Sequence, residues 1–297
     1  MNGIICINKP TDITSFGVVA KVRGIMRQKK AGHTGTLDPM ATGVLPVMLG
    51  DATRFLNYLP DSDKGYRATF VLGKTTDTLD ITGEVLTECE TDSGAVEIAE
   101  ILPDFTGKIM QLPPMYSAKS VDGVRLYELA RQGKEVDREP CEVEIKKLEL
   151  IGENDGEFTI DVICSKGTYI RSLIADIGEK LGCGAVMTSL CRTLACGFTP
   201  DDCVTLDELQ EIRDNDGDFS DRIIELDRVL AAYKKVVVSP AQTRRFSNGG
   251  ALDINRIKVK CEPDEICTVY GAEGDFLGLA QNTNGELKAL RLMPHRQ

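Results

Sequence analysis

The side chain best suited to chemistry is Asp38, which stands in the run GHTGTLDP at residues 32–39. Glycines in and after this run allow tight turns and close approach of the backbone, and Pro39 fixes the chain just after the carboxylate. Such a loop can hold one acid rigidly at a cleft, where an ionised carboxylate acts as a nucleophile or a base. An aspartate before a proline is also a common turn residue. The loop alone therefore favours a structural turn, and a catalytic role needs support from other segments.

Other kinds of chemical site find less support. The glycine-rich run lacks the Gly-x-x-x-x-Gly-Lys-Ser/Thr pattern of a phosphate-binding loop. Ten cysteines are scattered along the chain without a Cys-x-x-Cys pair, and neither His33 nor His295 stands at ligand spacing to a cysteine pair. We therefore expect reduced cysteines that mostly pack in the core, and no metal site.

The elements around Asp38 follow from the spacing of the apolar residues. Thr14 is a candidate helix N-cap, and apolar residues at helical spacing from 18 to 26 predict a helix whose polar face is basic. This helix leads into the Asp38 loop, and the apolar run at 44–49 predicts a strand directly after the loop. Asp51 is placed to cap a short helix behind that strand.

Further along the chain, two alternating segments at 66–72 and 158–164 predict strands with one apolar face. The pattern between residues 167 and 182 predicts a helix that starts directly after the second strand. Thr205 with Glu208 predicts a capping box for another helix. Because strands and helices do not alternate regularly, the pattern favours an α+β fold with a mixed or antiparallel sheet over a doubly wound sheet.

The last part of the chain is predicted to be a separate small domain. Turn signals such as Asn284-Gly285 separate short strand candidates at 266–270 and 276–280. We therefore expect a domain at 1–235 that carries Asp38 and a compact, mostly β domain at 240–297.

Composition and charge limit the environment and the partners. No run approaches the roughly 20 apolar residues of a membrane span, and no secretory leader is recognisable, so we expect a cytoplasmic protein. The net charge of −11 argues at first against a nucleic-acid partner. However, segments 88–104 and 201–227 together carry −15, which leaves +4 on the rest of the chain. Basic clusters such as the one in residues 1–35 therefore permit RNA binding without demonstrating it.

The motifs around Asp38 resemble those of the TruB family of tRNA pseudouridine synthases. The similarity covers roughly the first 230 residues strongly, and the C-terminal domain is more weakly similar to the PUA-type RNA-binding domain of that family. The resemblance implies an α+β pseudouridine synthase catalytic domain followed by a small β-rich PUA-like domain. The matching segments are GHTGTLDPMATGVLP at 32–46, GDATR at 50–54, Lys9-Pro10, Thr14-Ser15, Tyr66, Leu72-Gly73, TDT at 76–78, PPMYSA at 113–118, SKGTYIR at 165–171, Leu190 and Arg192-Thr193.

The resemblance implies a role for each matched side chain. Asp38 would be the catalytic carboxylate, and Arg171 would oppose the effect of burial on its pKa. Tyr66 would stack on the target uracil, Leu190 would line the uracil pocket, and Tyr169 would bind substrate beside Arg171. Without this resemblance, Tyr66 and Leu190 would be interpreted as ordinary core residues, and Arg171 as a member of a surface ion pair.

Contacts with RNA follow from the same resemblance. The target base must leave its stack, at a cost of a few kcal/mol, and His33 would take up the vacated space. Lys9, Lys21, Arg27 and Lys30 would contact phosphates, while the C-terminal domain would hold a distal part of the RNA.

The implied reaction is the isomerisation of uridine 55 in the T loop of tRNA to pseudouridine. This reaction breaks the N1–C1′ bond, rotates the uracil and rejoins it through C5. It needs no redox step or hydrolysis, so the resemblance implies no cofactor and no essential metal. Asp38 would act either as a nucleophile or as a base that starts cleavage by elimination. We expect a monomer that binds the T arm of tRNA, with no guide RNA and no membrane.

Three alternatives stay open from the sequence. The first is a guide-dependent relative, although such chains tend to be basic with lysine-rich tails. The second is a non-catalytic RNA-folding protein that keeps the fold. The third is a nucleotide enzyme that uses the glycine-rich run to bind phosphate.

Overall fold

The computed structural model describes residues 1–117, 119–121 and 123–294. Ala118 of the PPMYSA segment and residues 295–297 of the expected C-terminal domain lie outside these ranges. The strands are β1 (Gly3–Lys9), β2 (Ala31–His33), β3 (Thr42–Leu49), β4 (Lys64–Leu72), β5 (Lys74–Thr76), β6 (Val85–Glu88), β7 (Gly107–Gln111), β8 (Ser120–Val121), β9 (Val124–Arg125), β10 (Cys141–Asn154), β11 (Glu157–Cys164), β12 (Ala185–Leu194), β13 (Cys203–Val204), β14 (Lys234–Val237), β15 (Leu252–Asp253), β16 (Ile266–Tyr270), β17 (Phe276–Thr283) and β18 (Glu286–Leu292). The α-helices are α1 (Ser15–Ile25), α2 (Ala95–Ile101), α3 (Leu126–Ala130), α4 (Ile170–Lys180), α5 (Leu206–Asp214), α6 (Asp227–Leu230) and α7 (Pro240–Ser247).

A large mixed sheet forms the frame of the first domain. Its strand order in the described residues is β13-β1-β3-β12-β4-β11-β10-β7, and β2 pairs with β3 outside that path. The pairs β1/β13 and β3/β12 are parallel, whereas β4 is antiparallel to both β11 and β12. The α+β class with a mixed sheet, expected from the sequence, is confirmed.

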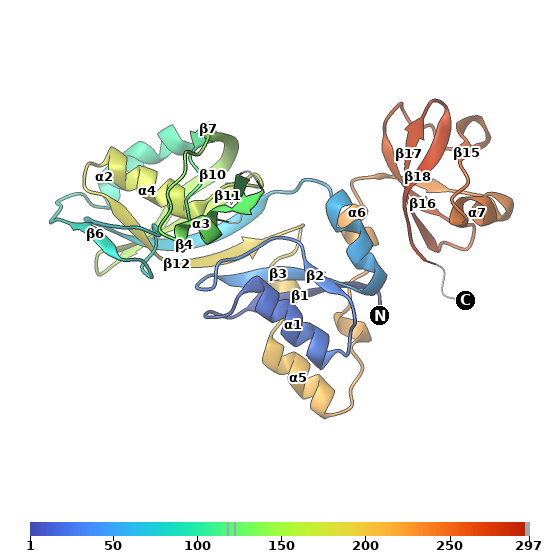
Figure 1. The fold of residues 1–297 in the computed structure, drawn as a ribbon, viewed down its shortest axis with the longest axis horizontal. Coiled ribbons are helices and arrows are strands. Elements are labelled where there is room, and N and C mark those ends of the chain that lie inside the picture. Colours follow the sequence, from blue (N-terminus) through green and yellow to red (C-terminus); the bar gives the residue numbers. More distant parts are fainter. Residues whose placement is uncertain (118, 122, 295–297) are drawn as a thin grey trace.

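Helices cover this sheet in two groups (Figure 1). Helices α1 and α5 pack beside β1 and β3, where their apolar residues share one buried cluster. Helix α4 packs on β12 and β4, and α2 packs on β10, over a second buried cluster. The strand pairing between β3 and β12 joins the two parts, since Thr42 and Gly43 lie opposite Cys191 and Arg192. The segment after Asp38 therefore meets a distant motif of the sequence.

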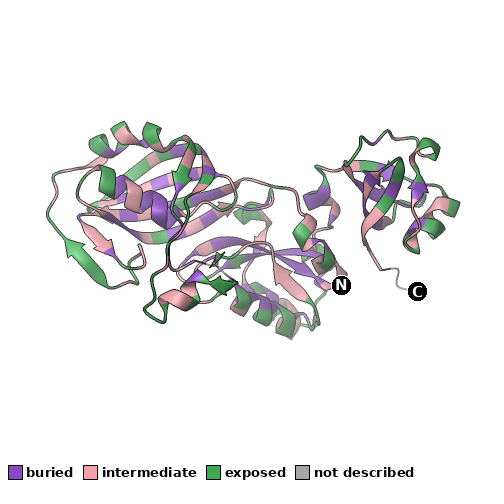
Figure 2. Cartoon of the chain, turned by 45° about the horizontal axis from the view of Figure 1, so that its top comes forward, coloured by how far each residue is buried: buried purple, intermediate pink, exposed green. Residues whose placement is uncertain are grey.

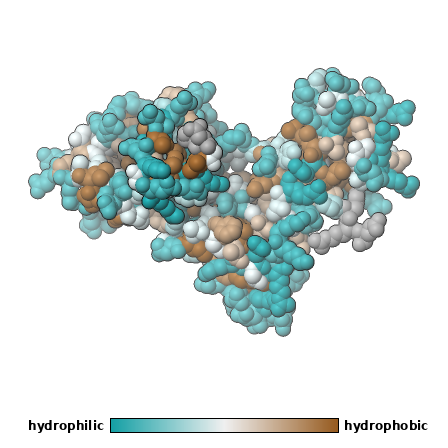
Figure 3. All heavy atoms as spheres, in the orientation of Figure 1, coloured by the Kyte–Doolittle hydropathy of each residue, from teal (hydrophilic) through white to brown (hydrophobic). Residues whose placement is uncertain are grey.

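The C-terminal part has a sheet and a core of its own (Figures 1 and 2). Its strand order is β14-β16-β17-β18-β15, and the strands expected at 266–270 and 276–280 correspond to β16 and β17. A third apolar cluster joins this part to the first domain, with the rings of Phe55 and Phe276 at 5.3 Å between centroids. Figure 3 shows a largely hydrophilic face with separate apolar patches.

Local sequence signals are confirmed at two helices and wrong at a third. The Thr14 hydroxyl accepts a hydrogen bond from the Gly17 N–H, and Thr205 with Glu208 forms the capping box of α5. Asp51 does not cap the helix after β3, because the 3₁₀ helix Gly50–Tyr58 already includes it in its first turn. Its carboxylate instead accepts from the Lys30 ammonium at 3.4 Å. None of the described helices is long and apolar enough to cross a membrane.

Helix α4 carries a half-buried acid that we expect to cost stability. Burial, reinforced by the charge of Glu179, raises the pKa of Asp176 to about 6. This position is also in the second half of the helix, where the dipole disfavours negative charge. A raised folded-state pKa means that stability is lost as pH rises through that value. We therefore predict that Asp176→Asn stabilises the protein at pH 8 by up to about 1 kcal/mol, allowing for partial exposure.

The measurement is chemical denaturation of both proteins at pH 8 and at about pH 3, since below the ordinary aspartate pKa the group is protonated in both the folded and the unfolded state and contributes little difference. Asp207→Asn, at an exposed position near the start of α5, is the control. An equal gain at both pH values would show that charge is not the cause.

Candidate active site

The Asp38 loop connects β2 to β3, and buried side chains hold its backbone on both sides of the carboxylate. The Ser15 hydroxyl, at the start of α1, accepts from the Leu37 N–H at 2.8 Å and donates to the Leu37 carbonyl at 3.0 Å. The Lys9 ammonium donates to the carbonyls of Pro39 at 2.9 Å and Ala41 at 2.5 Å. Asp38 is therefore held in place by the first strand and the first helix of the chain.

Arg192 completes this support from β12. Its side chain is fully buried, and its guanidinium donates to the carbonyls of Val44 at 2.8 Å, Gly35 at 3.3 Å and Thr36 at 3.5 Å. Gly43, at φ +95°, passes so close to the Arg192 backbone that a Cβ there would lie 2.3 Å from its carbonyl oxygen. The glycine is thus required by the approach of β3 to β12.

Arg171, in the first turn of α4, is the partner of the Asp38 carboxylate. Its Nη2 lies 2.9 Å from Oδ2 of Asp38, and its Nη1 lies 3.4 Å from Oδ2 of Asp80. The same guanidinium donates to the carbonyls of Thr78 at 2.9 Å and Tyr116 at 2.7 Å. One buried cation therefore serves two carboxylates and fixes the segments that carry Thr78 and Tyr116 around them.

Burial has the larger effect on the proton affinity of Asp38. Burial raises the pKa of this carboxyl group above its ordinary value, Arg171 lowers it by less, and Asp80 raises it again. The guanidinium was expected from the sequence to oppose burial, and it does so only in part because its charge is shared with Asp80. The side chain of Asp38 keeps 35% exposure, so a substrate can reach it.

Two adjoining cavities meet at Asp38 and Arg171. The inner one, of about 190 Å³, is lined by Tyr66, Tyr169 and Leu190 as well as by this ion pair. The outer one, of about 580 Å³, shares Leu37, Asp38 and Arg171 with it and opens among polar and aromatic side chains. The side chains that line the outer cavity include Asp12, Thr14, Phe16, His33, Thr82, Tyr116, Arg125, Tyr127 and Arg131.

The inner cavity is built from adjacent strands. Tyr66 on β4 lies opposite Arg192 on β12, and Leu190 lies opposite Ala68, the next residue on the same face of β4. Tyr66 and Leu190 are each 7% exposed, and burial raises the pKa of the Tyr66 hydroxyl, so the phenol is neutral near pH 7. Tyr169 is the N-cap residue of α4, where its N–H donates to the Gln111 side chain at 2.7 Å. The structure thus brings four of the five expected substrate-binding residues, Tyr66, Tyr169, Arg171 and Leu190, to one cavity with Asp38, whereas His33 is not among the residues that line it.

His33 and the basic residues lie at different depths. His33, at the end of β2, lines the outer cavity, and burial followed by the charge of Arg192 lowers its pKa, which makes the ring neutral near pH 7. Lys21, Arg27 and Lys30 are exposed on and after α1.

The expectation that Lys9 contacts a phosphate is wrong. Lys9 is fully buried, and its ammonium donates to three backbone carbonyls, of Pro10, Pro39 and Ala41. Burial lowers its pKa to about 8, even though Asp38 and Asp12 act in the opposite direction. Its position at the end of β1 directs the side chain beneath the Asp38 loop, away from solvent.

Three residues at this site were assigned no role in the sequence. Asp80 lies two residues beyond the TDT segment, Arg192 lies inside a matched segment, and Lys64 precedes Tyr66 by two residues on β4. Asp80 holds Arg171, Arg192 holds the loop, and Lys64 lines the inner cavity, where burial followed by Arg192 lowers its pKa. The alternating segment recognised in the sequence began at residue 66, whereas β4 begins at Lys64, and a lysine at a strand end is ordinarily solvated.

The chain matches known families and relatives over nearly its whole length. Residues 23–170 match the family described as "TruB family pseudouridylate synthase (N terminal domain)", 171–237 match "tRNA pseudouridylate synthase B C-terminal domain", and 235–293 match "Pseudouridine synthase II TruB, C-terminal". The chain is 43% identical over 298 residues to the tRNA pseudouridine synthase B of Clostridium perfringens (strain 13 / Type A), covering 99% of each chain. It is 51% identical over 297 residues to that of Pseudomonas fluorescens (strain Pf0-1), covering 99% of this chain and 96% of the other.

Solved structures support the fold. A chain in the crystal structure of a Cbf5-Nop10-Gar1 complex is similar with a TM-score of 0.76 at 24% identity, over 98% of this chain and 85% of that one. This similarity includes the C-terminal part as well as the large sheet. With the family matches and the relatives above, it shows that the chain belongs to the TruB family of pseudouridylate synthases.

Proposed function

We propose that this protein isomerises uridine 55 in the T loop of tRNA to pseudouridine, with Asp38 as the catalytic carboxylate. One observation carries the proposal. Asp38, Tyr66, Leu190 and the neighbouring residues Tyr169 and Arg171 come from four separate segments and line a single cavity of about 190 Å³. The family and the names of the relatives agree with a tRNA substrate.

The geometry supports a different role for each residue that lines the inner cavity. Tyr66 and Leu190 offer apolar surface to a flipped uracil, with Asp38 exposed at the mouth towards the sugar. Asp38 reacts as an ionised carboxylate, either by attack on the nucleoside or by removing a proton to start elimination of uracil. Arg171 keeps the carboxylate oriented in both cases, and Tyr169 closes the side of the cavity near the start of α4.

Outside the inner cavity, the protein meets the RNA loop. The neutral ring of His33 suits a space vacated by a flipped base better than a phosphate contact, because it carries no charge near pH 7. Lys21, Arg27 and Lys30, which are exposed on and after α1, are proposed to contact phosphates. Lys30 already shares its charge with Asp51, so its contribution should be the smallest.

The domain division is also part of the proposal. The sequence predicted domains at 1–235 and 240–297, but β14 (Lys234–Val237) pairs with β16 in the C-terminal sheet. The proposed boundary therefore lies earlier, with a catalytic domain that ends near residue 233 and a PUA-like RNA-binding domain that begins with β14. We propose that the protein acts as a cytoplasmic monomer on the T arm, without guide RNA and without a cofactor.

The test is incubation of the purified protein with unmodified tRNA, followed by mapping of pseudouridine at single-nucleotide resolution. Pseudouridine at position 55, formed without guide RNA, is expected. A matched tRNA with cytidine at position 55 should give no product. Absence of product from wild-type protein with intact tRNA would overturn the proposal. RNA annealing that persists without any isomerase activity would instead favour an RNA-folding protein.

Lys9 provides a prediction about loop support. Replacing it by methionine removes an ammonium from three backbone carbonyls. The buried carbonyl of Ala41 then costs about 1–3 kcal/mol unless water reaches it, while those of the exposed residues Pro10 and Pro39 cost less. The Asp38 loop should shift, and a displacement of about 1 Å at a reacting group can cost about a hundredfold in rate. We therefore predict a large drop in kcat with little change in tRNA affinity. A Lys9→Met variant that loses affinity but keeps kcat would indicate a phosphate contact instead; Lys21→Met is the exposed control.

A further inference from the structure

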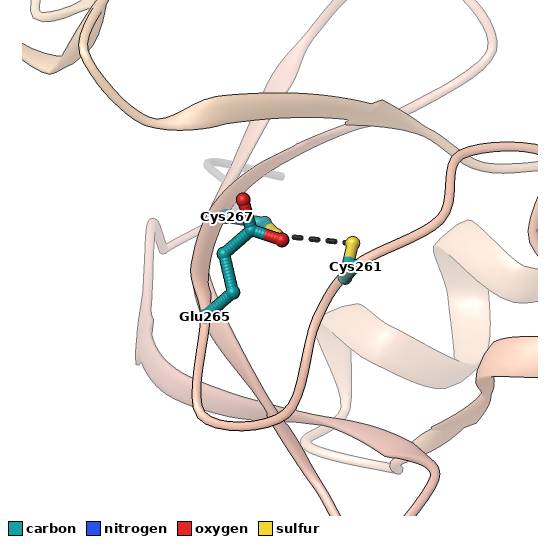
Figure 4. A group of neighbouring side chains, drawn as sticks. All are labelled: Cys261, Glu265 and Cys267. Carbon is teal, nitrogen blue, oxygen red and sulfur yellow. Dashed lines mark hydrogen bonds between the residues drawn. The ribbon is translucent and has the colours of Figure 1, made fainter.

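A group of metal-ligating side chains lies in the C-terminal part, apart from the active site (Figure 4). Cys261 and Glu265 belong to the segment before β16, and Cys267 is the second residue of that strand. One ligand atom from each residue lies within 4.8 Å of the others. Cys261 is 3% exposed and Cys267 is fully buried, so the two sulfurs are shielded from solvent.

The segment is held in this arrangement by polar contacts around the three side chains. Oε2 of Glu265 accepts from the Glu262 N–H at 2.8 Å and from the Lys234 ammonium at 2.8 Å. The Asn282 side chain donates to the Cys261 carbonyl at 2.8 Å, while its own Oδ1 is buried without a hydrogen-bond partner. The segment is thus held in place before any ion binds, and Asn282, which contacts the backbone of Cys261, carries a buried acceptor without a partner.

Distances favour an ion over a disulfide. The sulfurs of Cys261 and Cys267 are 3.1 Å apart, against about 2.05 Å in a disulfide. A tetrahedral zinc ion with bonds of about 2.3 Å holds two sulfurs about 3.8 Å apart, so each sulfur would move by only a few tenths of an ångström.

Charge balance leads to the same choice. Two thiolates, the Glu265 carboxylate and the Lys234 ammonium sum to −2, which one divalent cation neutralises. Both thiols are buried, and a buried thiolate without a counter-ion is unfavourable. A metal ion can still displace the thiol protons, because its bonds to sulfur compensate for the deprotonation.

We propose that Cys261, Glu265 and Cys267 bind one thiophilic divalent cation of the zinc type, with a water molecule as fourth ligand. Binding releases two thiol protons to solvent and ties the segment before β16 to that strand. The water is a candidate donor to the unpaired Oδ1 of Asn282. The sequence indicated no metal site because the spacing Cys-x₅-Cys, with glutamate inside it, matches no familiar zinc motif. This inference does not depend on the proposed function.

The experiment uses the full-length protein, treated with a chelator and a reductant. Titration with Co²⁺ should give a thiolate-to-cobalt charge-transfer absorption that saturates at one ion per chain, and Zn²⁺ should abolish it. Calorimetric titration with Zn²⁺ in buffers of different ionisation enthalpy should report the release of about two protons. Cys261→Ser and Cys267→Ser should each remove most of the charge-transfer absorption, and Glu265→Gln should weaken affinity by at least tenfold.

The matched control is Cys89→Ser, which changes an exposed cysteine elsewhere and should leave the titration unchanged. If a cysteine variant fails to fold, the proposal is still tested by proton release from the wild-type protein and by the metal affinity of Glu265→Gln. Absence of a cobalt band, no proton release, or binding that survives both cysteine substitutions would overturn the proposal. A mass 2 Da lower in metal-free, unreduced protein, restored by reductant, would identify a disulfide instead.

Discussion

Asp38→Asn is expected to reduce pseudouridine formation by at least about a thousandfold, because asparagine cannot ionise, attack or accept a proton as a carboxylate does. Binding of tRNA should change little, since the side chain keeps its size and the surrounding cavities stay in place. The measurement is single-turnover kinetics, which separates the chemical step from product release. Product formation that falls less than tenfold would remove Asp38 from the reaction.

The same substitution should not destabilise the protein at neutral pH. The folded-state pKa of Asp38 lies above its ordinary value, so the ionised group costs stability above that pKa and contributes no cost when it is protonated. Asp38→Asn should therefore be at least as stable as the wild type at pH 7.5, with the difference disappearing near pH 3, below the ordinary pKa of an aspartate. Thermal denaturation at both pH values checks this. A marked loss of stability at pH 7.5 would mean that the carboxylate is chiefly a structural partner of Arg171.

Elements with strong local signals were predictable from the sequence. The helix after Thr14, the strands at 66–72 and 158–164 and the capping box at Thr205 depend on neighbouring residues, and the structure contains them. The order of strands in the sheet could not be predicted from local sequence patterns. Whether β3 pairs with β12 is decided by packing between segments almost 150 residues apart, which no local pattern records.

In the candidate site, too, some residues were predictable from the sequence and others were recognised only from the structure. Asp38, Tyr66 and Arg171 were proposed from motifs, and the structure adds the geometry that joins them. The role of Lys9 was misjudged because a lysine near other basic residues is ordinarily solvated, and only the closing of β1 under the loop buries it. Asp80 and Arg192 act through other residues, so their importance appears only when their partners are known.

Arg171→Met should give the second large effect, because it leaves Asp38 and Asp80 without the cation between them. Two carboxylates that face each other without a counter-ion raise each other's pKa, and burial adds to this. The acid limb of the kcat/KM profile, which reports the free enzyme, should therefore move to higher pH. Loss of one partner from a buried pair also costs about 3 kcal/mol of stability. Arg67→Met, which breaks an exposed pair with Asp161, should cost less than about 1 kcal/mol.

A second substitution tests whether Asp80 is the cause of this shift. In Arg171→Met/Asp80→Asn, the like charge next to Asp38 is gone, so the acid limb should return towards lower pH even though the guanidinium is still missing. Arg171→Lys should keep the limb near its wild-type position but lose at least about tenfold in rate, since one ammonium cannot replace a fork that reaches Asp38, Asp80 and two carbonyls. If the limb of the double variant coincides with that of Arg171→Met, Asp80 does not govern the ionisation of Asp38, and the guanidinium acts mainly by orienting the carboxylate.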